Sequence, residues 1–282
     1  MKRFTIVRTL MVAALVAAAG PVTGALAASK GKVPEHQHWH FSGPFGTFDK
    51  DALQRGFQVY ETVCSNCHGM ELLSFRNLGQ KGGPFYLDSC PEGVPDTIDC
   101  SNPTQNPIVK AIAENYKFKV TDGPDDFGEM FQREPLPSDR IPGPFANEQI
   151  ARLANNNAYP PDLSLITKAR HHGPDYIHAL LTSYQEPPED VTVAPGQYYN
   201  PYYPGGVLAM AQPLYDDVVA YEDGSPQTVE QYSKDVTEFL MWAAEPKMEA
   251  RKSLGVMTMI YLVILAGILY WSYRKVWSNV KK

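Results

Sequence analysis

The chain is poor in cysteine, because its 282 residues include only four. Cys64 and Cys67 form a C-x-x-C pair, but a structural zinc site would need two further ligands at similar spacing, and none follows. Cys90 and Cys100 are not paired in this way. The strand–helix–strand pattern around a thioredoxin-like C-x-x-C pair is also missing. These absences argue against a zinc site and against a thioredoxin-like fold.

Basic residues are scarce between the two ends of the chain. Residues 28–252 hold 18 of the 25 Lys and Arg residues but all 31 Asp and Glu residues, so their net charge is −13. This charge excludes nucleic acid or an anionic lipid surface as the main partner. It favours a basic protein partner, whose association it would accelerate. Simple solubility is the alternative explanation.

Long apolar stretches occur only near the two ends. A basic start (residues 2–8) precedes an Ala- and Val-rich stretch (9–19), and the small-x-small pattern A-L-A ends at Ala27. This order is typical of a secretory signal peptide, so we predict that residues 1–27 are cleaved. A retained N-terminal anchor is the alternative, but the stretch is short for a membrane span.

The second apolar stretch runs from Leu254 to Tyr273 without a charge. As a helix it would measure about 30 Å, the thickness of the hydrocarbon core of a bilayer. We therefore predict a single-pass anchor in the inner membrane over residues 253–273, rather than a buried core helix. The signal peptide places residues 28–252 on the periplasmic side as the globular domain and residues 274–282 in the cytoplasm.

The stretch Cys64-Ser65-Asn66-Cys67-His68 matches C-x-x-C-H, the attachment motif of a c-type haem. Two thiols at this spacing form thioethers with the two vinyl groups of the porphyrin, and the histidine becomes an axial ligand of the iron. Leu53, Phe57 and Tyr60 predict an amphipathic helix leading into the motif. Gly56 is a poor helix former, so we expect another helix to approach closely there.

The other axial ligand must come from a distant part of the chain. Met130 and Met210 are the thioether candidates, and the imidazole candidates are His171, His172 and His178. Met210 lies in a segment rich in Pro, Gly and Tyr, which suits a ligand that reaches the iron without a helix of its own. Methionine–histidine ligation raises the reduction potential of a haem. The residues alone leave this choice open.

An ordered series of motifs resembles one family, cytochrome c1, the haem c subunit of the cytochrome bc1 (quinol–cytochrome c oxidoreductase) complex. The series covers nearly all of the predicted mature chain in order. Its members are RGFQVYETVCSNCH (55–68), DGPDDFGEMFQREPLPSD (122–139), ANNNAYPPDLSLITKARHHGPDYIHALLTSY (154–184), YYNPYYPGGVLAMAQPLYDD (198–217) and YEDGSPQTVEQYSKDVTEFLMWAAEPKMEARKSLG (221–255).

The resemblance implies a role for each matching residue. Cys64 and Cys67 would form the thioethers, and His68 and Met210 would bind the iron. The resemblance also implies that Arg170 pairs with a haem propionate, for which a guanidinium is well suited; from the residues alone it would be a surface arginine beside Asp175. Further residues fall in haem-pocket stretches of the family: Asn155, Pro161 and Tyr176.

The expected fold is mainly α, with a class I cytochrome c-type core, long Pro- and Gly-rich loops and one C-terminal transmembrane helix. A helix is predicted from Val229 to Ala243, with a capping box formed by Thr228 and Gln231. In the family this helix crosses the haem-motif helix. Residues 82–107 have no secure counterpart in the family pattern, and there we predict a disulfide between Cys90 and Cys100 in an oxidising compartment.

The predicted function is electron transport in a respiratory chain. One covalent haem c would receive electrons from the Rieske iron–sulfur protein and pass them to a soluble, basic-faced cytochrome c. The resemblance implies a cytochrome b subunit and a dimeric complex; quinol–cytochrome c reductase activity would belong to that complex, and the chain alone would be an electron carrier. The alternatives are a membrane-tethered cytochrome c that feeds a terminal oxidase directly, a haem-based sensor and a thiol oxidoreductase.

Overall fold

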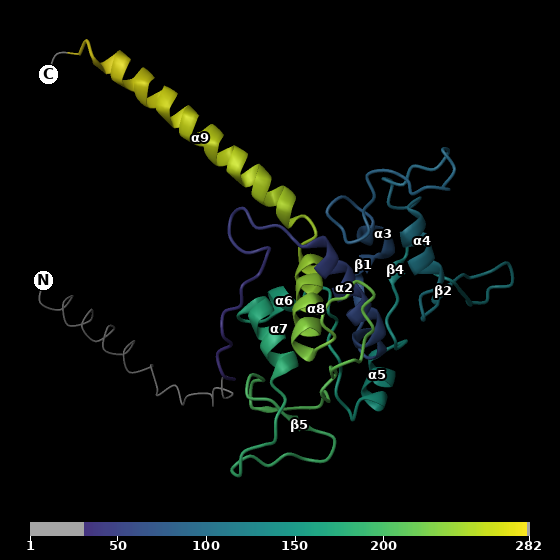
Figure 1. The fold of residues 1–282 in the computed structure, drawn as a ribbon. Helices are drawn as coiled ribbons and strands as arrows, with labels where there is room; N and C mark the ends of the chain where they lie inside the picture. Colours follow the sequence, from purple (N-terminus) through teal and green to yellow (C-terminus); the bar gives the residue numbers. More distant parts are fainter. Residues whose placement is uncertain (1–30, 281–282) are drawn as a thin grey trace, which may run out of the picture.

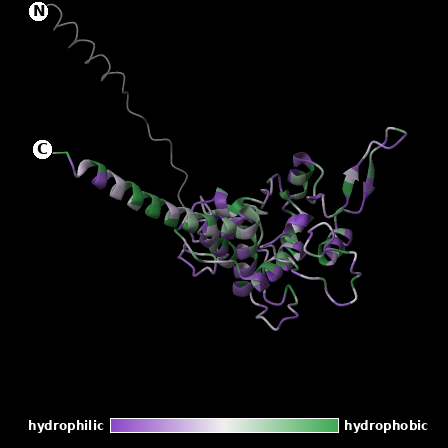
Figure 2. Ribbon diagram, turned by 90° about the horizontal axis from the view of Figure 1, so that it is seen from above, coloured by the Kyte–Doolittle hydropathy of each residue, from purple (hydrophilic) through white to green (hydrophobic). Residues whose placement is uncertain are grey.

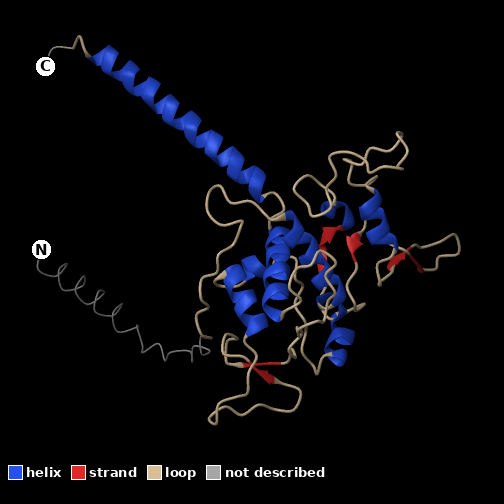
Figure 3. Ribbon diagram, in the orientation of Figure 1, coloured by secondary structure: helices blue, strands red, loops and turns tan. Residues whose placement is uncertain are grey.

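The computed structural model describes residues 31–280, so the predicted signal peptide lies outside the described residues. Helices dominate the described part of the chain, and long loops join them (Figure 3). The mainly α prediction is confirmed. The helices are α2 (Lys50–Thr62), the 3-10 turn η1 (Cys64–Asn66), α3 (Phe75–Leu78), α4 (Pro107–Glu114), α5 (Glu148–Ala154), α6 (Ile166–Ala169), α7 (Gly173–Thr182), α8 (Val229–Ala244) and α9 (Met248–Trp277).

The described strands form three small antiparallel ribbons. β1 (Met70–Ser74) pairs with β4 (Arg140–Ile141), and Met70 lies opposite Ile141. β2 (Val120–Asp122) pairs with β3 (Phe131–Arg133), and β5 (Tyr198–Tyr199) pairs with β6 (Val207–Leu208). These ribbons form no larger sheet among the described residues.

The centre of the core is the crossing of α2 and α8, which lie side by side in Figure 1. A Cβ atom at Gly56 would lie only 2.1 Å from the carbonyl oxygen of Asp235 and 2.6 Å from Cβ of Phe239. The expected close approach of another helix at Gly56 is therefore confirmed. Tyr60 and Phe239 are fully buried at this crossing, and burial of such a side chain contributes roughly 1.5–3 kcal/mol.

A buried ionic network fastens the same two helices. The Nε and Nη2 atoms of Arg55 donate to the two carboxylate oxygens of Asp235, at 2.9 and 3.0 Å. Nη1 of Arg55 donates to Asp223 at 2.9 Å, and Oη of Tyr221 donates to Asp235 at 2.9 Å. The charge of the buried Asp235 is thus paired, and the loop before α8 is tied to α2.

The start of α8 differs from the predicted capping box in one contact. Oγ1 of Thr228 accepts from the backbone N–H of Gln231 at 3.4 Å, as expected. The side chain of Gln231, however, donates to Asp235 at 3.1 Å instead of turning back to Thr228. The side-chain amide of Gln231, which would complete the capping box, is therefore part of the network around Asp235.

The N-terminal segment (residues 33–49) lies along α7 and reaches the base of α9. Asp175 on α7 accepts from Nε1 of Trp39 at 2.6 Å and from Nδ1 of His36 at 2.9 Å. Nζ of Lys252 in α9 donates to the carbonyl oxygens of Phe41 and Gly46, at 2.6 and 2.9 Å. These contacts join the anchor helix to the domain.

Helix α9 projects away from the domain (Figure 1), and green and pale colours cover most of it in Figure 2. It has 30 residues, and its apolar window has a mean hydropathy of 2.1 with no residue buried in the structure. By length and composition it fits a single-pass membrane anchor. The predicted span 253–273 lies within it, and the helix extends beyond both ends of that span.

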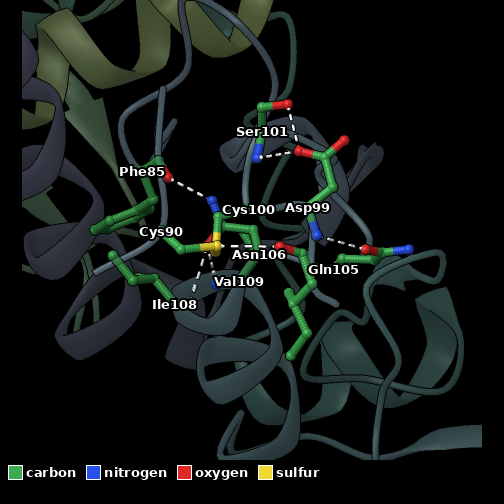
Figure 4. Close-up of a disulfide and its surroundings, with 10 residues drawn as sticks. Phe85, Cys90, Asp99, Cys100, Ser101, Gln105, Asn106, Ile108 and Val109 are labelled. Atoms are coloured by element: carbon green, nitrogen blue, oxygen red, sulfur yellow. Dashed lines mark hydrogen bonds between the residues drawn. A yellow bond between two sulfur atoms is a disulfide. The ribbon is translucent and has the colours of Figure 1, made fainter. Parts of the chain in front are cut away.

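The predicted disulfide between Cys90 and Cys100 is present, with Cα atoms 5.1 Å apart. Figure 4 shows it beside the start of α4, where the fully buried Asn106 caps the helix. The Asn106 side chain accepts from the N–H groups of Ile108 and Val109 and donates to the carbonyl oxygen of Phe85 at 2.8 Å. The disulfide thus closes a loop whose base is held by α4.

Candidate functional site

The C-x-x-C-H motif begins where α2 ends and tightens into η1. The N–H groups of Cys67 and His68 both donate to the carbonyl oxygen of Cys64, at 3.1 and 2.9 Å. Residues three apart eclipse in a 3-10 turn, so Cys64 and Cys67 are brought to one side of the chain. The turn is held from outside by Nζ of Lys117, which donates to Oδ1 of Asn66 at 2.9 Å and to the carbonyl oxygen of Glu61.

Cys64 and Cys67 are not joined by a disulfide. Burial raises the pKa of the Cys64 thiol to about 12 and also raises the pKa of the Cys67 thiol. A redox-active cysteine needs the opposite, a lowered pKa that supplies thiolate at neutral pH. The pair is therefore a poor dithiol catalyst, and its geometry fits attachment of a group across the turn.

The imidazole of His68 is oriented by a residue far along the chain. Nδ1 of His68 lies 2.8 Å from the carbonyl oxygen of Pro161, which can only accept, so Nδ1 carries the proton. Nε2 is then left with its lone pair free for a metal, the arrangement common to histidine ligands. Burial lowers the pKa of His68, which favours the neutral ring.

The segment around Pro161 is fastened along the chain that follows His68. The N–H of Leu163 donates to the carbonyl oxygen of Gly69 at 2.9 Å, and the N–H of Glu71 donates to Asp162 at 2.7 Å. The contact between Pro161 and His68 is therefore part of a continuous pairing of two segments. The sequence placed Pro161 in a pocket stretch but gave no role to its carbonyl group.

Large apolar side chains are exposed on both sides of Pro161. Leu153 at the end of α5 is 87% exposed, and Tyr159 and Leu165 are 49% and 46% exposed. These exposed apolar side chains are near in sequence to Pro161, which orients His68, and a large, mostly apolar group such as a porphyrin would be a suitable partner for such side chains. The donor set and these side chains together fit a haem c.

Met210 lies two residues after β6, in a loop, with its side chain half-buried. Its backbone is held by Oη of Tyr184, which donates to the carbonyl oxygen of Met210 at 3.1 Å. Met130, the other thioether candidate, is 61% exposed near the tip of the β2–β3 hairpin. This hairpin projects from the domain in Figure 1.

The three rival histidines are placed differently from His68. His171 and His172 are exposed at the start of α7. His178 is buried between α7 and α8, where Nδ1 lies 2.9 Å from Oγ of Ser233 and Nε2 lies 3.4 Å from Glu230. These contacts give His178 a packing role in the core.

Arg170 and Tyr176 lie close together at the start of α7. Burial raises the pKa of Tyr176, and the nearby Arg170 opposes this shift through its charge and a hydrogen bond. Asp175, the partner expected for a surface arginine at position 170, is bound instead by His36 and Trp39. The exposed guanidinium of Arg170 donates to the neighbouring Ala169 carbonyl and lies beside the Tyr176 hydroxyl. No carboxylate of the described residues forms an ion pair with it, so it is available to an anionic group.

Asn155 is the predicted pocket residue with the least direct link to the site. Its side chain donates to the carbonyl oxygen of Ala151 at 2.7 Å and so ends α5. The next two residues, Asn156 and Asn157, have φ values of 50° and 64°, a backbone conformation that asparagine tolerates well. Asn155 therefore shapes the turn that leads toward Pro161.

Comparison with known proteins gives a consistent result. The model of the Cytochrome C1 family matches residues 39–280. The chain is 48% identical over 265 residues to "Cytochrome b/c1" of Bradyrhizobium diazoefficiens, covering 87% of this chain but only 36% of that protein. It is 45% identical over 249 residues to "Cytochrome c1 1, heme protein, mitochondrial" of Arabidopsis thaliana, covering 88% of this chain and 73% of the relative. It is 42% identical over 274 residues to "Cytochrome c1" of Blastochloris viridis, covering 90% of each.

Proposed function

Because this chain belongs to the cytochrome c1 family, we propose that it is the electron-transfer subunit of a cytochrome bc1 complex. It receives electrons from the Rieske iron–sulfur protein and passes them to a soluble cytochrome c. The observation that carries the proposal is the oriented His68 beside two free thiols on one turn. A simple membrane-anchored thiol protein would have no use for this histidine geometry.

The residues would hold one haem c as follows. Cys64 and Cys67 would provide the two thioether sulfurs, His68 and Met210 would bind the iron, and Arg170 and Tyr176 would pair with the propionates. The bound haem c supplies a one-electron Fe(III)/Fe(II) couple. The protein keeps His68 neutral and fixes its ring through Pro161.

The chain is proposed to be divided by the membrane. Residues 1–27 are removed on export, residues 28–252 form the periplasmic cytochrome domain, residues 253–273 cross the inner membrane, and residues 274–282 remain in the cytoplasm. Helix α9 is continuous from the domain to its C-terminal end. The contacts of Lys252 and Glu249 with the N-terminal segment therefore fix the orientation of the domain relative to the anchor.

The partners follow from the same assignment. A cytochrome b subunit and the Rieske protein are partners in the same complex, and the whole complex is a dimer. The net charge of −13 over residues 28–252 attracts a soluble cytochrome c with a basic face and raises its association rate at low salt.

The test is co-purification of the intact complex. The full chain with a C-terminal tag is extracted from membranes with a mild detergent, and reduced-minus-oxidised spectra and Rieske EPR spectra are recorded. We expect b-type haem, haem c and a Rieske signal together. Haem c alone, or haem c with oxidase haems, would overturn the bc1 assignment in favour of a tethered electron shuttle.

Covalent attachment is tested with two matched cysteine pairs. We expect Cys64→Ser/Cys67→Ser protein to carry no haem through a denaturing gel, because both thioethers are lost. Cys90→Ser/Cys100→Ser protein should keep its haem, because this pair forms the separate disulfide. Covalent haem in the first double variant would exclude the proposed attachment.

A further inference from the structure

Met210 is presented by a segment that contains no helix and no ionisable side chain other than tyrosine. Residues 191–215 include no Asp, Glu, Lys, Arg or His. Neutral hydrogen bonds and packing therefore hold the segment. Hydrogen bonds between the segment and a helix determine the position of Met210.

The start of this segment is fixed to α7 by Asn200, which is fully buried. Nδ2 of Asn200 donates to the carbonyl oxygen of Leu180 at 2.8 Å, and Oδ1 accepts from the N–H of Tyr202 at 3.0 Å. The N–H of Asn200 donates to the carbonyl oxygen of Gly206 at 2.8 Å. The β5–β6 ribbon that precedes Met210 is thus closed and attached to the C-terminal half of α7.

A second tie lies at Met210 itself. Tyr184, two residues beyond the end of α7, donates from Oη to the carbonyl oxygen of Met210 at 3.1 Å. The side chain of Tyr184 is half-buried, and this is the one hydrogen bond of its hydroxyl among the described residues.

We propose that Tyr184 is a positioning residue, which holds the backbone of Met210 so that the thioether is presented to the iron. This inference rests on the proposed function, in which Met210 is the sixth ligand. A hydrogen bond to the carbonyl group of Met210 fixes the backbone there, and so fixes the point from which the side chain extends. Conformational entropy that the Met210 segment loses on folding does not have to be lost again when the Met210 thioether binds the iron.

The hydrogen bond between Tyr184 and Met210 also connects the segment that carries Met210 to the helices that carry His68. Helix α7 packs on α8 through the contact between His178 and Ser233, and α8 crosses α2, which leads into Cys64 and Cys67. Tyr184 therefore places Met210 relative to the same helices that place His68. Each of the two axial ligands is then oriented by a backbone carbonyl contact, at Pro161 for His68 and at Met210 for the thioether.

The test is Tyr184→Phe in the full-length holoprotein, with Tyr215→Phe as the matched control. Tyr215 is 57% exposed on the same segment, and its hydroxyl makes no hydrogen bond within the described residues. Cyanide, which competes with methionine for ferric haem, is the probe. Loss of one neutral hydrogen bond corresponds to about a threefold to tenfold change in an equilibrium constant. We expect cyanide to bind Tyr184→Phe more tightly by this factor, with weakening of the far-red absorption band of the methionine–iron bond.

The control should remain within about twofold of the wild type, and thermal unfolding followed by circular dichroism should be nearly unchanged for both variants. Cyanide affinity in Tyr184→Phe equal to that of Tyr215→Phe would overturn the inference. So would a fall in the unfolding temperature large enough to account for the loss of the band, because Tyr184 would then be a general packing residue.

Met210→Leu separates this inference from the proposed function. If Met210→Leu abolishes the far-red band and Tyr184→Phe changes nothing, Met210 is the ligand and only the positioning role fails. If Met210→Leu leaves the band and the cyanide affinity unchanged, the ligand assignment itself fails.

Discussion

The segment that carries Cys64, Cys67 and His68 is the end of a helix, whereas the segment that carries Met210 is a loop on a two-stranded ribbon. The first is fixed by the crossing of α2 and α8, with buried aromatic side chains and the paired charges of Arg55 and Asp235. The second is tied to α7 by the side chains of Asn200 and Tyr184. The proposed haem attachment would therefore lie on the more extensively packed support, and the proposed methionine ligand on the segment held by fewer contacts.

This difference implies two levels of stability in one domain. Damage to the helical crossing should unfold both segments, because α7 packs on α8 and α8 crosses α2. Damage to the methionine segment should change the ligand and leave the attachment turn folded. The predictions below separate these two levels, beginning with the largest expected effect.

Gly56→Ala should have the largest effect. The new Cβ would lie 2.1 Å from a backbone oxygen of α8, so the helices must move apart. Overpacking of a close helix contact costs typically 1–3 kcal/mol, and we expect about 3 kcal/mol here because the obstacle is backbone. Thermal unfolding of the holoprotein measures it, and the far-red band and the helical signal should be lost together.

Gly143→Ala is the matched control. Its new Cβ would meet Cα of Gly69 at 3.6 Å, which is ordinary van der Waals contact, so stability should change by less than about 1 kcal/mol. An equal loss of stability in both variants would show that the α2–α8 crossing is no less tolerant of an added methyl group than the loop at Gly143.

Asn200→Ala should have the next largest effect, on the methionine side alone. Removal of the buried amide leaves the carbonyl of Leu180 and the N–H of Tyr202 without these partners, at a cost of about 2 kcal/mol. We expect a lower reduction potential and a weaker far-red band, with the covalent haem and the helical signal retained. Redox titration and circular dichroism measure the two outcomes.

The control for Asn200 is Asn115→Ala at the exposed end of α4, where the side chain makes one hydrogen bond to Ala111. Its stability should change by about 0.5 kcal/mol or less and its potential should not move. If Asn200→Ala unfolds the helices as well, the methionine segment is part of the central core and the distinction between the two sides is wrong.

The helical side could be predicted from the sequence because its determinants are side-chain patterns. The apolar spacing at Leu53, Phe57 and Tyr60 predicted α2, and a glycine in that helix predicted the close approach that Asp235 makes at Gly56. Apolar length predicted α9 in the same way. The C-x-x-C-H motif is local in sequence, so its turn needed no knowledge of the fold.

The contacts that orient the two proposed ligands could not be predicted from these patterns. Pro161 acts on His68 through a backbone carbonyl from 93 positions away, and Tyr184 acts on the carbonyl of Met210. Every residue has a carbonyl group, so such a contact leaves no residue type as a signal. The pairing of Asp175 with Trp39 was missed for a related reason, because it depends on a tertiary path of the N-terminal segment.

The smallest predicted effect concerns pH, to which the two sides should respond differently. Burial raises the pKa of Glu61, next to the attachment turn, above its ordinary value of 4.5, although Lys117 opposes the shift. The folded protein therefore binds this proton more tightly than the unfolded chain. Stability from this group is fully present below pH 4.5 and is lost as pH rises from there through the raised pKa of Glu61.

Glu61→Gln should remove this decline, so its free energy of unfolding plotted against pH should be flatter than that of the wild type over the same window. Glu114→Gln, a change at an exposed position on α4, should follow the wild-type curve. The far-red band should stay constant through the window in all three proteins, because residues 191–215 carry no carboxylate, imidazole or basic group that titrates there. A band that changes with pH in the wild type but not in Glu61→Gln would mean that the attachment turn and the methionine segment respond as one unit, and the two levels of stability would then reduce to one.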